Sequence, residues 1–300
     1  MAVEGEAREA ASPREEWGFH KGDELAPGRL AVRRLGGGER YESHLAWDDR
    51  LFSLVVVKIL RPHLVDDAHA LRGLAAEADL LERLRHPVVV RGFDAVLDGP
   101  RPHLVLEYLE GPRLSTLIRK YGPVEREQLL PLGLQLCSAL HYLAGEGVVH
   151  LDVKPSNVIM GAPARLIDLS IARSTDELAG TRHRIGTDAY MAPEQCDPSG
   201  RGPITQAADV WGVGATLAHA ASGHPPFTAP SSAGERFPQL RDAPALADRV
   251  EPAMRDLLEA CLDPDPAARP TPAELAGELE ILVDAIPQRL VLGRFRVRRR

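Results

Sequence analysis

The stretch that decides the fold reads VVHLDVKPSNVIM over residues 148–160, and RLIDLS follows over residues 165–170. Asp152, Asn157 and Asp168 stand here in short polar intervals between apolar runs. Each acid alone is typical of a helix cap or a turn. Together they supply a carboxylate that can orient a hydroxyl and oxygen ligands for magnesium, and a lysine two residues after the first acid can stabilise phosphate charge. The combination indicates phosphoryl transfer.

These strings resemble the signature motifs of protein kinases. HLDVKPSN is similar to the HRDLxxxN loop of that family, and DLS stands in the place of its DFG. The resemblance implies that Asp152 is the catalytic base, that Lys154 contacts the transferred phosphoryl group, and that Asn157 and Asp168 bind magnesium. KPSN after the catalytic acid is more similar to serine/threonine kinases than to tyrosine kinases. With 4 lysines among 36 basic residues, the composition resembles that of bacterial Hanks-type (eukaryotic-like) kinases.

Upstream, VVVK at residues 55–58 resembles the strand motif whose lysine holds the α- and β-phosphates of ATP, which implies this role for Lys58. Glu77 stands where the family carries the helix glutamate that pairs with this lysine. Downstream, GTDAYMAPE at residues 186–194 resembles the end of a kinase activation segment. The resemblance implies three more interactions: Glu194 with Arg269, Thr187 with Asp152 and Lys154, and Asp209 with the catalytic loop.

The glycine-rich loop departs from the family pattern. In LGGGERYES, Gly36 and Gly38 fill the first two glycine places, but Tyr41 stands in the third. A tyrosine there stiffens the loop, so we expect weaker ATP binding than with a full glycine loop. The resemblance further implies that the adenine lies between Val56 and Ile159 and is bonded by backbone of the segment that includes Glu107 and Leu109.

The catalytic loop and the DLS motif also depart from the pattern. Leu151 replaces the arginine that receives an activation-segment phosphate in related kinases, which predicts an ordered state independent of phosphorylation at Ser174, Thr175 or Thr181. The missing glycine after Asp168 predicts that this acid leaves the site less readily.

Periodicity predicts a strand-rich first third and a helical remainder. Short runs rich in Val, Leu and aromatic residues predict strands, whereas apolar spacings of three and four predict helices. The expected strands cover residues 29–36, 42–47, 51–60, 88–93 and 103–109, and the expected helices cover residues 67–85, 126–144, 208–221 and a segment from 271.

The fold class expected from this pattern is α+β. The resemblance implies a bilobal kinase fold, with a small antiparallel sheet lobe containing one helix and a larger, mainly α-helical lobe, ATP lying between them. We expect a disordered N-terminal tail (1–27), a kinase domain (28–285, with lobes over about 28–107 and 110–285) and a basic C-terminal tail (286–300).

The composition and charge of the chain limit the cellular locations and the classes of partner that we expect for it. A net charge of -7 disfavours general nucleic-acid binding, and three distant cysteines without a metal-binding pattern indicate a reducing compartment. The first residues do not resemble a signal peptide and no run is long enough to span a bilayer, so we expect a cytoplasmic chain. The arginine-rich C-terminus favours a solvated tail or an added strand, with weak contact to an anionic surface as an alternative. A homodimer stays open.

The expected reaction is transfer of the γ-phosphoryl group of ATP to serine or threonine hydroxyls of proteins, with Mg²⁺ or, alternatively, Mn²⁺, and with autophosphorylation. One alternative is a pseudokinase, a nucleotide-binding regulatory or scaffold protein, which the altered glycine loop and DLS favour. A second is a small-molecule phosphotransferase, which the APE string opposes.

Overall fold

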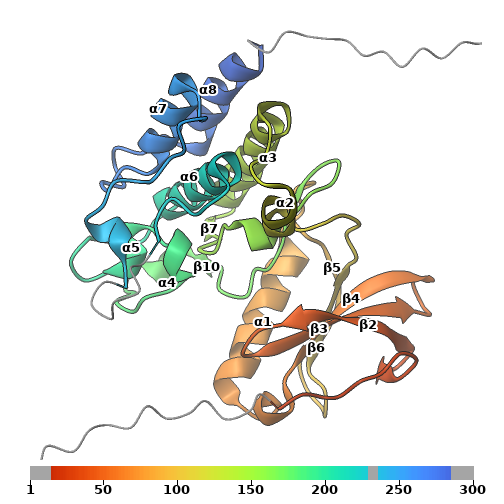
Figure 1. Ribbon diagram of the computed structural model, residues 1–300. Coiled ribbons are helices and arrows are strands. Elements are labelled where there is room, and N and C mark those ends of the chain that lie inside the picture. Colours follow the sequence, from red (N-terminus) through yellow and green to blue (C-terminus); the bar gives the residue numbers. More distant parts are fainter. Residues whose placement is uncertain (1–14, 229–235, 285–300) are drawn as a thin grey trace, which may run out of the picture. The chain divides into compact units, whose positions relative to one another are not determined.

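The structure is a computed structural model that describes residues 15–228 and 236–284. The chain divides into two compact units (Figure 1). Of the described residues, the sheet unit comprises 15–111 and 165–172, and the helical unit comprises 112–164, 173–228 and 236–284. The predicted α+β class, with a small antiparallel sheet and a larger helical part, is confirmed.

An antiparallel sheet of six strands, in the order β1-β2-β3-β4-β6-β5, forms the body of the sheet unit. Hydrogen bonds join Leu166 to Val88 and Val90, which ties residues 165–172 to this unit. Its elements are β1 (Glu24–Ala26), β2 (Arg29–Gly37), β3 (Tyr41–Asp48), β4 (Ser53–Leu60), the 3-10 turn η1 (Pro62–Leu64), α1 (Ala68–Arg83), β5 (Gly92–Val96), β6 (His103–Glu107) and β9 (Arg165–Leu166).

Strand β4 has one face in the core of the sheet, and its other face carries candidate site residues. Val55, Val57 and Ile59 are fully buried in one apolar cluster with residues of β1, β2, β3 and β6. Because side chains alternate along a strand, Val56 and Lys58 point to the opposite face.

Helix α1 begins where the sequence predicts. The Asp67 carboxylate accepts a hydrogen bond from the backbone N–H of Ala70 at 2.7 Å and caps the helix. Leu74, Glu77 and Leu81 follow at spacings of four or three residues and are all buried. Glu77 is therefore a carboxylate within the apolar stripe of the helix, and its burial requires a charged partner.

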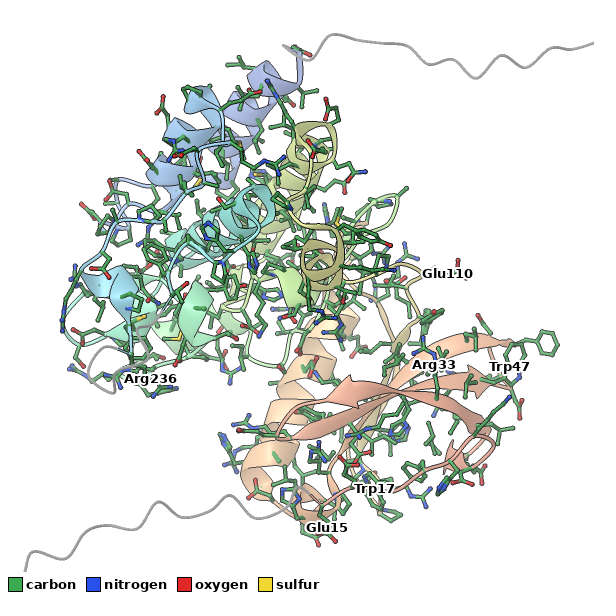
Figure 2. All side chains as sticks on the ribbon, viewed as in Figure 1. Glu15, Trp17, Arg33, Trp47, Glu110 and Arg236 are labelled. Atoms are coloured by element: carbon green, nitrogen blue, oxygen red, sulfur yellow. The ribbon has the colours of Figure 1, made fainter. Side chains whose placement is uncertain are left out.

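The segment from Glu15 to Pro27 corrects the prediction of a disordered tail over residues 1–27. Leu25 is fully buried in the sheet core, and Trp17 packs against the same cluster. The indole Nε1 of Trp17 donates to the carbonyl of Leu60 at 2.8 Å, and the ring lies beside the sheet unit in Figure 2. The segment is rich in charged residues, and its few apolar side chains that pack against the sheet have no regular spacing, so hydrophobic periodicity does not reveal them. Residues 1–14 lie outside the described residues.

The helical unit is built around α6, nearly all of whose residues are buried. A Cβ added to Gly214 of α6 would lie 2.6 Å from the Cβ of Cys261, so α7 approaches the α6 backbone as closely as glycine permits. The elements are α2 (Leu114–Tyr121), α3 (Arg126–Gly145), β7 (Val148–Val149), η2 (Pro155–Asn157), β8 (Val158–Ile159), β10 (Arg173–Ser174), α4 (Thr175–Leu178), η3 (Asp188–Tyr190), α5 (Pro193–Cys196), α6 (Ala207–Ser222), η4 (Pro238–Leu240), α7 (Pro252–Cys261) and α8 (Pro272–Asp284).

The predicted start of the last helix is confirmed. The Thr271 hydroxyl accepts from the N–H of Glu274 at 3.3 Å, and the Glu274 carboxylate accepts from the N–H of Thr271 at 2.8 Å. This reciprocal pair is a capping box, and Pro272 occupies the first turn, where its missing N–H is not needed. The predicted basic tail, residues 286–300, lies outside the described residues.

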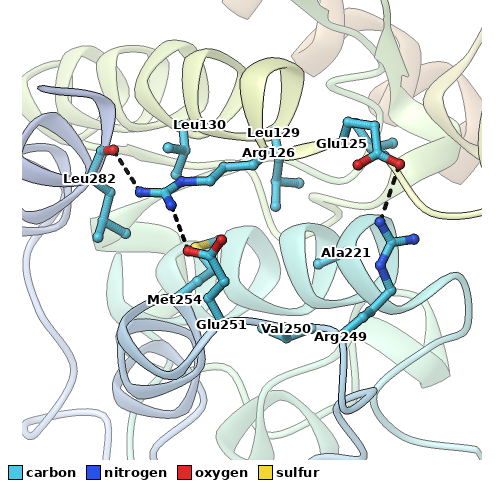
Figure 3. Close-up of a pocket in the computed structure, with 11 residues that line it drawn as sticks. Glu125, Arg126, Leu129, Leu130, Ala221, Arg249, Val250, Glu251, Met254 and Leu282 are labelled. Atoms are coloured by element: carbon cyan, nitrogen blue, oxygen red, sulfur yellow. Dashed lines mark hydrogen bonds and ion pairs between the residues drawn. The ribbon is translucent and has the colours of Figure 1, made fainter. Parts of the chain in front are cut away.

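Two ion pairs border a cavity of about 120 Å³ in the helical unit (Figure 3). Arg126 of α3 bonds Glu251 at 2.5 Å and the carbonyl of Leu282 at 2.9 Å, and Arg249 bonds Glu125 at 3.2 Å. These contacts link α3 to α8 and to the segment that leads into α7. Among the described residues, no helix is both long and apolar enough to cross a membrane.

Candidate catalytic and nucleotide-binding residues

Lys58 and Glu77 form the predicted ion pair. The Lys58 Nζ donates to both carboxylate oxygens of Glu77 at 2.8 Å, and both side chains are buried. A third bond, also at 2.8 Å, goes to Oδ1 of Asp168. Burial alone would lower the pKa of Lys58, but the charges of Asp168 and Glu77 outweigh it and raise this pKa. The lysine is thus a fixed ammonium whose three N–H groups are all engaged.

Asp168 reaches Lys58 from a strained backbone. Its φ is +72°, a left-handed conformation that costs a non-glycine residue on the order of 1–3 kcal/mol. The ion pair with Lys58 and the hydrogen bonds of Leu166 hold the segment in place. The carboxylate is only partly buried, with 37 % of the side chain exposed.

The ring of Tyr41 also contacts Lys58. The Lys58 Nζ lies 4.6 Å from the ring centroid, within the range of a cation–π contact. Tyr41 is buried, and a Cβ built on Gly73 of α1 would lie 3.8 Å from its hydroxyl. Burial is the main cause of the raised pKa of this tyrosine. The residue in the third glycine place thus packs inward against the lysine.

The glycine turn between β2 and β3 is tight, and the side chain of Arg61 supports it. The N–H of Gly38 donates to the carbonyl of Tyr41 at 3.1 Å, and φ of Gly36 is +144°, which favours glycine. A Cβ on Gly37 would lie 2.5 Å from the same carbonyl, so the middle glycine is the one that no side chain can replace. The fully buried Arg61 donates from Nε to the carbonyl of Gly38 at 2.9 Å.

The remaining nucleotide-binding candidates of the sheet unit lie on β4 and at the end of β6. Val56 is half-buried two residues before Lys58, on the same face of the strand. Glu107 accepts from the N–H of Arg91 at 2.8 Å and pairs with Arg165, so its side chain is structural. Leu109 is half-buried beyond the end of β6.

In the helical unit, Asp209 holds the backbone of the catalytic loop as predicted. Its two carboxylate oxygens accept from the N–H groups of His150 at 2.7 Å and Leu151 at 2.8 Å. Burial raises the pKa of Asp209, while His150 and the two N–H bonds oppose that rise. Leu151 has φ of +67°, and its carbonyl accepts from Nε2 of Gln195 at 3.0 Å. The loop is therefore fixed on both sides of a strained residue.

Asp152, which follows this strained residue, is held at both carboxylate oxygens. The Thr187 hydroxyl donates to Oδ1 at 2.7 Å, and the Asn157 amide donates to Oδ2 at 2.9 Å. The Lys154 Nζ lies 2.8 Å from Oδ2 and donates to the Thr187 hydroxyl at 2.5 Å. The predicted contacts of Thr187 with Asp152 and Lys154 are present. A carboxylate held in this way can accept a proton from a hydroxyl in one fixed orientation.

A buried ion pair fixes the segment that carries Thr187. Arg269 donates to both carboxylate oxygens of Glu194, at 2.6 and 2.9 Å, and the side chains are fully buried. This is the predicted pair in its two-bond form, which orients as well as binds. Ile159, the last nucleotide-binding candidate, is buried in β8, where it forms a bridge with Arg113.

The protein kinase domain model matches residues 31–278, which include all of the candidate catalytic and nucleotide-binding residues. The chain belongs to the protein kinase family. It is 34 % identical over 239 residues to the serine/threonine-protein kinase PkaA of Streptomyces coelicolor, covering 77 % of this chain and 44 % of that protein. It is 35 % identical over 260 residues to the probable serine/threonine-protein kinase PkwA of Thermomonospora curvata, covering 84 % and 34 %.

A third relative is the serine/threonine-protein kinase PknB of Mycobacterium tuberculosis, 33 % identical over 221 residues, which are 70 % of this chain and 35 % of that protein. The matched part spans less than half the length of each of these relatives.

Three residues that hold the site backbone are not marked by the sequence motifs. Gly37 has the least room of the three glycines, although it lies between the two glycine places of the family pattern. Arg61 and Gln195 are buried polar residues whose side chains donate hydrogen bonds to backbone carbonyls of the site, those of Gly38 and Leu151. No local signal marks them, because arginine and glutamine are usually exposed and neither residue belongs to the motifs quoted above.

Proposed function

We propose that this chain is an ATP-dependent protein kinase that phosphorylates serine and threonine hydroxyls of protein substrates, with autophosphorylation. The observation that carries the proposal is the carboxylate of Asp152, held by Thr187, Asn157 and Lys154. The family membership and the printed names of the relatives support the same reaction class.

In this proposal Asp152 orients the acceptor hydroxyl and takes up its proton as the oxygen bonds to the γ-phosphorus and the bond to ADP breaks. Lys154 stabilises the charge that develops on the transferred group. Lys58, fixed by Glu77, binds the α- and β-phosphates. The residues proposed to contact the rest of the nucleotide are Gly36, Gly38, Val56, Glu107, Leu109 and Ile159.

Asp168 and Asn157 are the residues proposed to hold a divalent cation, and their oxygens are the donors that Mg²⁺ prefers. The Asn157 amide donates its N–H to Asp152, which leaves its oxygen without a protein partner among the described residues. No group of three His, Cys, Asp or Glu side chains in the described part of the chain could hold a metal. A divalent cation bound by Asp168 and Asn157 would take further ligands from phosphate and water, and it would neutralise phosphate charge.

The proposal includes a cytoplasmic location. All three cysteines are buried free thiols, which agrees with a reducing compartment. We keep contact of the C-terminal arginines with an anionic surface, and a homodimer, as open predictions.

The test is transfer of radiolabelled γ-phosphate with Mg²⁺, comparing the wild type with Asp152→Asn and Lys58→Met, followed by phosphoamino-acid analysis. We expect label on serine and threonine in the wild type and a loss of about 10²- to 10⁴-fold in Asp152→Asn. Thermal melting and binding of an ATP analogue check that Asp152→Asn is folded and binds nucleotide.

A protein that binds nucleotide without transferring phosphate is the alternative, and the Tyr41 ring against Lys58 is the observation that favours it. Absence of label from all three proteins would establish that alternative. Label on tyrosine would overturn the proposed acceptor class.

A further inference from the structure

A cavity of about 400 Å³ opens between residues 182–184 and the end of α5 in the helical unit. Its lining is mainly polar and carries two arginines and a histidine. The residues are Arg182, His183, Arg184, Cys196, Asp197, Pro198 and Ser199. None of them has a part in the proposed phosphoryl transfer, so the cavity is available for another purpose.

Several contacts hold one wall of the cavity in place. Arg184 donates from Nε to the carbonyl of Cys196 at 2.7 Å, and its guanidinium lies 5.0 Å from the ring centre of Phe237. Gln195 donates to the carbonyl of Ile185 at 2.8 Å, which ties the same stretch to α5. These contacts hold the arginine in one place before any ligand arrives, which reduces the entropy lost on binding.

The charge of the cavity is positive. Arg182 is exposed and forms no hydrogen bond or ion pair with any other described residue. Asp197 is the single carboxylate in the lining, and its Oδ1 accepts from the N–H of Gly200 at 3.1 Å. Nearby, Asp188 is already paired with Arg236, labelled in Figure 2, at 2.6 and 3.1 Å. In a chain of net charge -7, a positive cavity attracts anionic ligands selectively.

The cavity also lies close to the proposed acceptor site. Arg184 precedes Thr187 by three residues, and Thr187 contacts both Asp152 and Lys154. Three extended residues span at most about 10 Å, and five span about 17 Å. A side chain a few residues from an acceptor serine can therefore reach Arg184 or Arg182.

We propose that this basic cavity binds an anionic side chain of the substrate protein, a carboxylate or a phosphate, a few residues from the phosphorylated serine or threonine. A guanidinium offers two parallel N–H groups to either anion. The inference rests on the proposed kinase function and adds a substrate class to it: acidic or previously phosphorylated segments.

The test uses fluorescent serine peptides in which glutamate, glutamine or phosphoserine is placed at each position on either side of the acceptor. Binding is measured by anisotropy without ATP, and kcat/KM is measured separately by γ-phosphoryl transfer. We expect the best glutamate or phosphoserine peptide to bind the wild type about tenfold more tightly than its glutamine counterpart. Arg182→Glu should abolish this preference, and Arg184→Gln should reduce it.

The matched control is Arg119→Glu, which makes the same charge change at an exposed residue of α2. It should keep the preference for the anionic peptides. Equal binding of all three peptides to the wild type, or an equal loss in Arg119→Glu and Arg182→Glu, would overturn the inference. Anion-selective binding without phosphoryl transfer would support this cavity while refuting the proposed kinase activity. Thermal melting shows whether each variant is folded.

Discussion

The two units hold their functional side chains by different means. In the sheet unit, Lys58, Glu77 and Asp168 are held by one another's charges, and the Tyr41 ring closes the group. In the helical unit, Asp152 stands on a loop whose backbone is held by Asp209 and by Gln195.

The two units should therefore respond differently when a functional residue is replaced. A group held by opposite charges changes with any substitution that removes one of them, because a buried charge without a partner is unfavourable. A loop held by backbone hydrogen bonds keeps its shape while its exposed side chains are exchanged. The sheet unit should therefore lose stability when a functional residue is replaced, whereas the helical unit should lose activity first.

Glu77→Met should produce the largest loss of stability. Removing one partner of a buried pair typically costs about 3–5 kcal/mol of unfolding free energy. Urea denaturation measures the loss. The double variant Lys58→Met with Glu77→Met should recover part of it, because the buried Lys58 ammonium that lost Glu77 is then absent too, while Asp168 stays partly exposed to water. Strict additivity of the two single losses would contradict the description of the sheet unit as charge-held.

Asp209→Asn should cost less, about 1–3 kcal/mol. Asparagine keeps one oxygen acceptor, so one of the N–H groups of His150 and Leu151 loses its partner. The strained Leu151 then loses support, and kcat should fall more than KM for ATP rises. Steady-state kinetics with urea denaturation separates these effects, and unchanged kcat in a folded variant would show that the loop does not depend on this carboxylate.

Tyr41→Gly should lower KM for ATP by about two- to thirtyfold, which corresponds to a cation–π contact of roughly 0.5–2 kcal/mol. Removal of the ring opens one side of Lys58 to phosphate and adds freedom to the turn. Tyr41→Phe is the control, since it keeps the ring and should leave KM unchanged. An unaltered KM in the folded glycine variant would mean that Tyr41 does not restrict nucleotide binding.

The smallest effect is expected for thiol modification. Burial raises the pKa of Cys137, Cys196 and Cys261 to about 12, and all three lie in the helical unit. The native thiols should stay protonated and unlabelled by iodoacetamide at pH 8, whereas the urea-unfolded chain reacts. The folded protein binds these protons more tightly than the unfolded chain, so their contribution to stability is lost as pH rises from about 9 towards 12. Fast native labelling would show that the helical unit opens readily.

The resemblance to protein kinases predicts the interactions that lie at motif positions. It implies the pairs of Lys58 with Glu77, Glu194 with Arg269 and Asp209 with the catalytic loop, and the structure contains all three. The strands and helices were predicted because their apolar periods are regular.

The positions of Tyr41, Arg61 and Trp17 depend on packing that no local sequence pattern encodes. The Tyr41 ring packs against Lys58, and the buried Arg61 donates to the carbonyls of Gly38 and Glu15, which are distant in the sequence. Trp17 lies in a stretch of charged residues, and only the completed sheet offers it a surface. Such residues become visible when strand register and side-chain contacts are known together.

The attachment of Trp17 gives this kinase a built-in optical signal. Its indole N–H is bonded to Leu60, and Arg101 lies 5.5 Å from its ring centre. Its backbone N–H is bonded to Glu42, which contacts Arg61 beneath the glycine turn. Release of this segment would expose the indole to water and shift its fluorescence emission to longer wavelength. With Trp47→Phe and Trp211→Phe, the emission of one residue would then report the state of the turn in real time.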